Sequence, residues 1–295
     1  MEEIAHQFDL DCTAGRSRGL YWIDEGFAFD LVFNPSRTFS LDHSAELAAG
    51  LQESAVSIAE GMGFNLDVDV IVQPAEGREK KLLVADMDST IIGQECIDEL
   101  ADYAGIKPSI AAITERAMRG ELDFEHALTE RVALLEGLDV AIIGRCLKER
   151  IRSNPGAETL VRTMRARGAG TLLVSGGFVD FVEPVAAAVG FERHVANRLG
   201  KKGKELSGLL DGPIVDAEAK KAAMLIECAE LGIEAADVLA IGDGANDIPL
   251  IAAAGLGIAY RAKPALIAVA DGRIDHHGLD ALLWAQGIAR KDWVI

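Results

Sequence analysis

The sequence predicts an α/β fold, namely a doubly wound, mostly parallel sheet with an inserted helical segment and a small α+β domain at the N-terminus. Three short apolar runs predict the sheet, because residues 82–85, 171–174 and 238–241 have the length and composition of buried strands. Acidic, small or glycine residues follow each run, at the strand ends where open α/β sheets bind ligands. The N-terminal residues instead combine short strand-like segments with one helix-like segment.

The N-terminal domain is predicted over residues 1–78 and the larger domain over residues 79–295. A break in the apolar pattern separates them, because proline, glycine and several charged residues occupy positions 73–80. The first part of this domain is expected to be two strands, at residues 19–23 and 28–33, joined by a turn. An amphipathic helix with Ser44 as its cap is expected at residues 44–61, and a strand with one solvent-exposed face at residues 66–72. The sequence leaves open whether this domain is a regulator, a dimer handle or a structural extension.

Two aspartates follow the first strand of the larger domain. Asp86 and Asp88 come directly after residues 82–85. Their spacing allows one carboxylate to attack an electrophile and the other to transfer a proton. An acidic turn that only ends the strand and caps a helix is the structural alternative. The catalytic interpretation is favoured because a second acidic cluster follows another predicted strand.

That second cluster is the segment Gly242–Asp247, which follows residues 238–241. Its glycines permit a tight turn and a close approach of the backbone to a ligand. Asp243, Asn246 and Asp247 supply hard oxygen atoms of the kind that Mg²⁺ prefers. An ordinary loop is disfavoured because both acidic clusters follow strands of matching character.

An anion-binding element is predicted between the two acidic clusters. The tripeptide Ser175–Gly177 follows residues 171–174 and precedes a predicted helix at residues 178–189. A serine hydroxyl and free backbone N–H groups at a helix N-terminus bind anions, and the serine is also expected to be the N-cap. Further along the chain, Lys220 and Lys221 begin another predicted helix, and one of them can point inward as a fixed positive charge.

These elements occur in the order found in the haloacid-dehalogenase superfamily of phosphohydrolases, and the chain resembles its phosphoserine phosphatase family over about residues 80–285. The matching segments are residues 86–90, 95–98, 114–124, 131–132, 175–178, 216–220, 242–247, 254–260 and 262–264. The resemblance implies Mg²⁺-dependent hydrolysis of O-phospho-L-serine to L-serine and phosphate through an aspartyl phosphate, the last step of serine biosynthesis. It also implies that residues from about 97 to 154, which carry no strand pattern, form a helical cap that closes over the substrate.

The resemblance assigns the chemistry to the aspartates. Asp86 is the expected nucleophile, and Asp88 is the expected general acid and then the general base. Mg²⁺ is expected on the Asp86 carboxylate, the Asp88 backbone carbonyl and the Asp243 carboxylate. Asp247 is expected to orient a metal-bound water or Lys220 without contacting the substrate itself.

Other residues are expected to hold the substrate. The phosphate ligands that the resemblance implies are Ser175, Gly176, Lys220 and Asn246. Glu95 is expected to pair with the substrate ammonium, Arg131 to form a fork with its carboxylate, and Met118 to provide an apolar lid. Each of these three has an ordinary alternative, namely a surface helix charge, a solvated arginine and a core methionine.

The composition restricts the partners and the compartment. A net charge of −18 disfavours nucleic acid and anionic membranes, and the resemblance implies a small-molecule substrate. The chain starts with acidic residues, unlike a signal peptide, and contains no apolar run near the ~20 residues that cross a bilayer. The adjacent His276 and His277 are expected in a surface loop. The sequence leaves open whether the protein forms a homodimer. Scattered cysteines indicate reduced thiols in a cytoplasmic protein: Cys12, Cys96, Cys146 and Cys228.

Two other functions stay open at this point. A related phosphotransferase would pass the phosphoryl group of the same aspartyl phosphate to an alcohol such as homoserine instead of water. A catalytically silent binding protein on the same fold is the second alternative, and the intact acidic motifs and lysine count against it.

Overall fold

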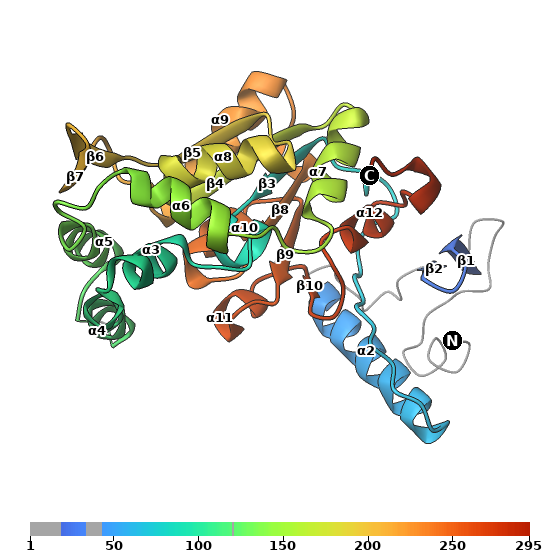
Figure 1. Cartoon of the computed structure of the whole chain (residues 1–295). Helices are drawn as coiled ribbons and strands as arrows, with labels where there is room; N and C mark the ends of the chain where they lie inside the picture. Colours follow the sequence, from blue (N-terminus) through green and yellow to red (C-terminus); the bar gives the residue numbers. More distant parts are fainter. Residues whose placement is uncertain (1–18, 34–42, 120) are drawn as a thin grey trace.

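The structure is a computed structural model that describes residues 19–33, 43–119 and 121–295. Its centre is a six-stranded sheet in which all neighbouring strands run parallel (Figure 1). In spatial order the strands are β10 (Gly272–Ile274), β9 (Leu256–Tyr260), β8 (Val238–Gly242), β3 (Leu82–Ala85), β4 (Gly170–Phe178) and β5 (Arg193–Asn197). The predicted parallel sheet is confirmed, and the three predicted core strands lie side by side in it as β8, β3 and β4.

Helices cover both faces of this sheet. One face packs against α7 (Ala157–Ala166), α8 (Val179–Val189) and α12 (Ala281–Ala285), and the other packs against α9 (Ala217–Leu231), α10 (Ile248–Ile251) and α11 (Pro264–Ile267). Successive residues of β3 alternate between the two cores, with Leu83 and Ala85 in the first and Leu82 and Val84 in the second. Because both faces are covered, the strand has the continuous apolar sequence typical of a buried parallel sheet.

Five α-helices lie between β3 and β4, and the first four of them, together with the N-cap residue Glu95, form what we call the helical insertion. These four helices are α3 (Cys96–Ala104), α4 (Lys107–Met118), α5 (Phe124–Ala133) and α6 (Ala141–Arg150). Leu100 and Leu128 of the insertion are buried in the same core as α7 and α8. On its surface, the guanidinium of Arg150 lies 3.0 Å from the carboxylate of Glu99 and joins α6 to α3.

A second contact ties the insertion to the main domain. An antiparallel hairpin follows β5 and consists of β6 (Leu199–Lys202) and β7 (Glu205–Leu210). The backbone N–H of Gly137 donates to the carbonyl of Leu206 at 2.9 Å, and the N–H of Leu206 donates to the carbonyl of Leu138 at 2.8 Å. The loop between α5 and α6 is therefore bound to the hairpin through backbone hydrogen bonds.

The described N-terminal residues form the predicted hairpin and helix. These elements are β1 (Gly19–Asp24), β2 (Ala28–Val32) and α2 (Ser44–Gly61), and α2 projects from the body of the molecule beside β10 (Figure 1). Ser44 is the first residue of α2 and not its cap, because His43 occupies the N-cap position and makes no side-chain cap hydrogen bond. The hairpin contacts the C-terminal residues. The Arg290 guanidinium lies 3.9 Å from the ring centre of Phe27, and the backbone N–H of Arg290 donates to the Asp24 carboxylate at 2.9 Å.

The predicted strand at residues 66–72 is wrong. The segment runs along the edge of the sheet with one antiparallel bridge, between Ile71 and Gly272. The Asp69 carboxylate accepts hydrogen bonds from the three consecutive backbone N–H groups of residues 275–277. Side-chain contacts of this kind replace the backbone ladder that a strand would need.

The histidine pair lies in a loop, as expected. Nδ1 of His277 lies 2.8 Å from Asp69, and Nδ1 of His276 lies 3.6 Å from Asp67. Within the described ranges, no helix is long and apolar enough to span a bilayer. Cys12 lies outside the described residues, and the other cysteines are buried free thiols: Cys96, Cys146 and Cys228.

Candidate active site

The carboxyl-terminal parts of three neighbouring strands and the loops beside them meet at one edge of the sheet and line a cavity of about 160 Å³. Asp86 follows β3, Asp243 follows β8, and Ser175 lies near the end of β4. The helical insertion supplies the opposite wall, which includes Glu95 and Arg131. Parallel strands place their carboxyl ends at one edge, and this topology brings the distant sequence motifs together.

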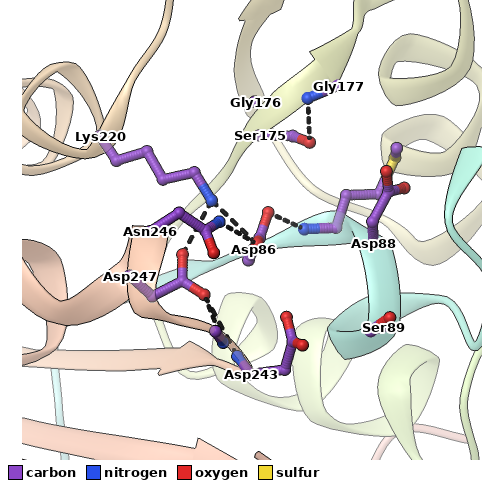
Figure 2. A network of polar contacts seen from close by, with 12 residues as sticks. Asp86, Asp88, Ser89, Ser175, Gly176, Gly177, Lys220, Asp243, Asn246 and Asp247 are labelled. Atoms are coloured by element: carbon purple, nitrogen blue, oxygen red, sulfur yellow. Dashed lines mark hydrogen bonds and ion pairs between the residues drawn. The ribbon is translucent and has the colours of Figure 1, made fainter. Parts of the chain in front are cut away.

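A buried ion-pair network fixes Asp86 (Figure 2). The Nζ atom of Lys220 lies 2.8 Å from Oδ2 of Asp86 and 2.8 Å from Oδ1 of Asp247. Asn246 donates to the same Asp86 oxygen at 3.3 Å, and the backbone N–H of Met87 donates to the other oxygen at 2.7 Å. Burial alone lowers the pKa of Lys220, but the two carboxylates outweigh it and raise that pKa. Lys220 is therefore the inward-pointing, permanently charged member of the lysine pair.

Asp88 lies in the distorted helical turn Met87–Ile91 that follows β3, and the turn includes Ser89 at a φ of 54°. The Oδ2 atom of Asp88 accepts a hydrogen bond at 3.3 Å from the backbone N–H of Cys96, which is the first residue of α3. The Oδ1 atom of Asp88 is buried and has no hydrogen-bond partner among the described residues. Burial, reinforced by the nearby charge of Glu95, raises the pKa of Asp88 to about 7. A carboxyl group with this pKa can give and take a proton near neutral pH.

Ser175 is buried in β4, which continues beyond it to Phe178. The prediction that it caps the next helix is wrong, because the irregular pairing of β4 with β5 lengthens the strand and α8 begins only after Phe178. The Ser175 Oγ instead accepts a hydrogen bond from the N–H of Gly177 at 2.9 Å. A Cβ atom on Gly176 would lie 3.2 Å from the ring of Phe124, so glycine allows α5 to approach this strand end closely.

Two oppositely charged side chains of the insertion face the aspartates across the cavity. Glu95 is exposed, and its Oε1 accepts a hydrogen bond from the Ser89 hydroxyl at 2.7 Å. Arg131 is half-buried, and its Nε donates to the carbonyl of Ala127 at 3.2 Å. Burial lowers the pKa of Arg131, while the carboxylates of Asp98 and Glu95 oppose that effect. The outer wall of the cavity thus carries one anion and one cation.

The cavity also has wall residues to which the sequence assigned no role: Ile97, Phe124, Leu128, Phe178 and Lys263. A local signal for Phe124 was present in the sequence. The preceding Asp123 caps α5 by accepting the N–H of His126 at 2.8 Å, and a capped helix start fixes the direction of the residue beside it. Met118 is the last residue of α4, and its side chain lies outside the described part, so its predicted role as a lid stays a prediction.

The carboxylates suit a small divalent cation. Asp86, Asp243 and Asp247 each offer an oxygen, and these atoms lie within 4.8 Å of one another. Both oxygens of Asp247 are already engaged, one with Lys220 at 2.8 Å and one with the backbone N–H of Asp243 at 3.2 Å. Burial raises the pKa of Asp243, and a bound cation would stabilise its charged form. These hard oxygen donors fit Mg²⁺, with Asp86 and Asp243 as the ligands on the cavity side.

Comparisons with known proteins identify the family to which the chain belongs. A family model described as haloacid dehalogenase-like hydrolase matches residues 83–252. A probable phosphoserine phosphatase of Schizosaccharomyces pombe is 41% identical over 87% of this chain and 89% of its own length. The crystal structure of a HAD family hydrolase from Salmonella enterica serovar Typhi is 30% identical, covers 85% of this chain and 83% of its own, and has a TM-score of 0.74. A substrate-bound phosphoserine phosphatase is 38% identical over 70% of this chain and 97% of its own, with a TM-score of 0.65. The chain therefore belongs to the haloacid dehalogenase-like hydrolase family.

Proposed function

We propose that this hydrolase is a phosphoserine phosphatase, which converts O-phospho-L-serine and water to L-serine and phosphate in the last step of serine biosynthesis. The observation that carries the proposal is the single cavity that joins Asp86 and Asp88 to Glu95 and Arg131. The aspartates supply phosphatase chemistry, and the other two residues supply partners for the ammonium and carboxylate of an amino acid. Relatives named for phosphoserine support the same substrate.

The reaction proceeds in two displacements. An Asp86 oxygen attacks phosphorus, the bond from phosphorus to the serine oxygen breaks, and Asp88 gives its proton to that oxygen. A water molecule then attacks the phosphorus of the aspartyl phosphate, Asp88 takes the proton of the water, and phosphate leaves Asp86. Proton transfer of this kind contributes ~10²–10⁴-fold to a rate. Lys220 stays beside Asp86 throughout and offsets the negative charge that gathers there.

The phosphate group is held by donors at two strand ends. The Ser175 Oγ already accepts the Gly177 N–H, so its hydroxyl proton is available to a phosphate oxygen. The Gly176 N–H, the Asn246 side chain and Lys220 provide the other positive partners. Such pre-positioned donors lower a barrier by ~3 kcal/mol each.

The proposal includes one Mg²⁺ held by the Asp86 carboxylate, the Asp88 backbone carbonyl and the Asp243 carboxylate. When bound, the ion would neutralise charge on the transferring phosphoryl group. Asp247 would keep its present contacts with Lys220 and the Asp243 backbone, and it would orient both groups from behind the site.

The proposed organisation has residues 1–78 as a separate N-terminal domain, and residues 79–295 as the phosphatase domain with a cap at about 97–154. The cap would close over the substrate, exclude water and use Met118 as an apolar lid. The same proposal includes a small-molecule partner, no nucleic acid, no membrane and a cytoplasmic location, and it leaves open whether the protein is a homodimer. The net charge of −18 supports the exclusion of anionic polymers and surfaces.

A screen of phosphorylated amino acids and sugars, with Mg²⁺ present and absent, tests this function. Phosphoserine should release phosphate faster than the other compounds, and chelation of Mg²⁺ should stop the release. Free phosphate and phosphorylated alcohols are measured separately, so that transfer to an acceptor other than water is detected. A preference for sugar phosphates, or release that is independent of Mg²⁺, would contradict the proposal.

A further inference from the structure

Two lysines reach the acidic cluster, and the structure holds them in different ways. Lys220 is 1% exposed and lies between two buried carboxylates. Lys263 is 69% exposed, and its Nζ lies 3.5 Å from Oδ2 of Asp243 at the wall of the same cavity. One lysine is therefore locked in the core, while the other lies at the solvent side of the site.

The main chain keeps Lys263 beside Asp243 whatever its side chain does. The backbone N–H of Lys263 donates to the backbone carbonyl of Asp243 at 2.8 Å. Lys263 is also the N-cap residue of α11, and Pro264 fixes the next position. The ammonium is thus tethered within reach of Asp243, while the exposed four-carbon stem leaves it free to turn away.

The contact between Lys263 and Asp243 is weak enough to be exchanged. Water and salt screen the exposed ammonium, and 3.5 Å is a long separation for an ion pair. The Asp243 carboxylate is mostly buried, and this lysine is its one ion-pair partner among the described residues. In a protein with a net charge of −18, the ammonium offsets one charge of a crowded acidic cluster.

We infer that Lys263 is a positioning residue that holds Asp243 in the metal-free protein and competes with the metal for it. This inference rests on the proposed function, because it takes Asp243 as a ligand of Mg²⁺. A divalent ion that binds Asp243 must displace the ammonium and then remain near its positive charge. Lys263 therefore weakens Mg²⁺ binding, and in the metal-free site it offsets the repulsion among the carboxylates.

Calorimetric titration of the substrate-free full chain with MgCl₂ tests this inference. The variant Lys263→Met should bind Mg²⁺ roughly three- to tenfold more tightly, as expected for the removal of one charge about a Debye length or less from the ion. Lys263→Arg keeps the charge and should stay within about twofold of the parent affinity. The control Lys291→Met makes the same change in net charge at an exposed C-terminal position, and it should also leave the affinity unchanged.

The salt dependence gives a second measurement. Raising the salt concentration to about 0.5 M should remove most of the difference between Lys263→Met and the parent, since ions screen the charge. Equal affinity in Lys263→Met and Lys291→Met, or weaker binding in Lys263→Met, would overturn the inference alone. Absence of Mg²⁺ binding by the parent protein would overturn the proposed metal site and this inference with it.

Discussion

The carboxyl edge of the sheet and the helical insertion form opposite walls of one cavity, and they hold their side chains differently. At the edge, Asp86 and Asp247 are almost fully buried and fixed to one lysine by contacts of 2.8 Å. In the insertion, Glu95 is exposed and Phe124 is 38% exposed. The groups proposed to react are thus positioned by a buried core, and the groups proposed for recognition lie on the more exposed wall. Substitutions at the edge should affect every phosphate ester, and substitutions in the insertion should affect phosphoserine more than an ester that lacks the amino-acid part.

The largest effect should come from Asp86, the proposed nucleophile. Asp86→Asn should lower kcat for every phosphate ester by ~10⁴-fold or more, because an amide oxygen neither attacks phosphorus nor pairs with Lys220 as a carboxylate does. Phosphoenzyme trapped by acid quench should disappear from the variant. Circular dichroism checks that the variant is folded, and retained phosphate release from it, with contaminating phosphatase excluded, would refute the mechanism.

Asp88 should matter according to the leaving group. Asp88→Asn nearly keeps the shape but loses the proton, so phosphoserine hydrolysis should fall by ~10²-fold or more. An aryl phosphate with an acidic leaving group needs no proton and should form the phosphoenzyme with a smaller loss. Single-turnover measurement of that first step compares the two esters, and equal losses would show that Asp88 is not the acid.

The raised pKa of Asp88 adds a pH test of the same role. Asp88 must be protonated to act first as an acid, so kcat/KM for phosphoserine should fall as the pH rises above about 7. The carboxylate of Glu95 helps to raise this pKa. Glu95→Gln should therefore move the descending limb of the profile to lower pH. A limb that stays in place would mean that another group controls it.

Substitutions in the insertion should distinguish substrates. Arg131→Lys keeps the charge but loses the two-pronged geometry, and Glu95→Gln loses the charge opposite the ammonium. Each should cost phosphoserine ~1–3 kcal/mol in kcat/KM, relative to a small aryl phosphate that lacks both groups. Arg116→Lys is the matched control, because Arg116 lies in the same insertion and pairs with Glu130 at 2.7 Å outside the cavity wall. Equal losses on both substrates would assign Glu95 and Arg131 to the support of the fold.

The sheet edge was predictable because its signals are local. Buried parallel strands require continuous apolar runs such as Leu82–Ala85, and polar residues directly after them can only lie at the carboxyl edge. The inward direction of Lys220 was not predictable, since the choice between it and Lys221 depends on how α9 packs against the sheet. The cap prediction for Ser175 failed for a similar reason. Irregular pairing with β5 extends β4, and no local pattern encodes that pairing.

The other regions gave weaker signals. A single charge such as Glu95 or Arg131 on a helix has the same sequence appearance whether it contacts water or a substrate, so its role came from the family resemblance alone. At residues 66–72, alternation predicted a strand, although alternation does not show whether a partner edge is available. The structure provides one bridge there and places Asp69 against the loop at residues 275–277.

Asp69 lies outside both walls, and its substitution should affect stability without affecting catalysis. Burial alone raises its pKa, but hydrogen bonds from Asp275, His276 and His277 outweigh it and bring the pKa below the usual value. Asp69→Asn should lower the free energy of unfolding by ~1–3 kcal/mol near pH 6, the range for hydrogen bonds to a charged group, and leave kcat/KM within about twofold. Asp67→Asn is the matched control, because Asp67 is 83% exposed and its contact with His276 is 3.6 Å long.

The pH dependence of this loss has a definite sign. The folded-state pKa of Asp69 lies below the unfolded value, so its contribution is complete above the unfolded pKa of about 4 and declines as the pH falls through the folded pKa. The difference in unfolding free energy between the parent and Asp69→Asn should therefore be constant from pH 5 to 7 and shrink below about pH 4. Urea titrations across this range measure it. A difference that grows in acid would contradict the lowered pKa of Asp69. A loss of kcat/KM as large as that of Arg131→Lys would show that the loop bound by Asp69 belongs to the catalytic part of the molecule.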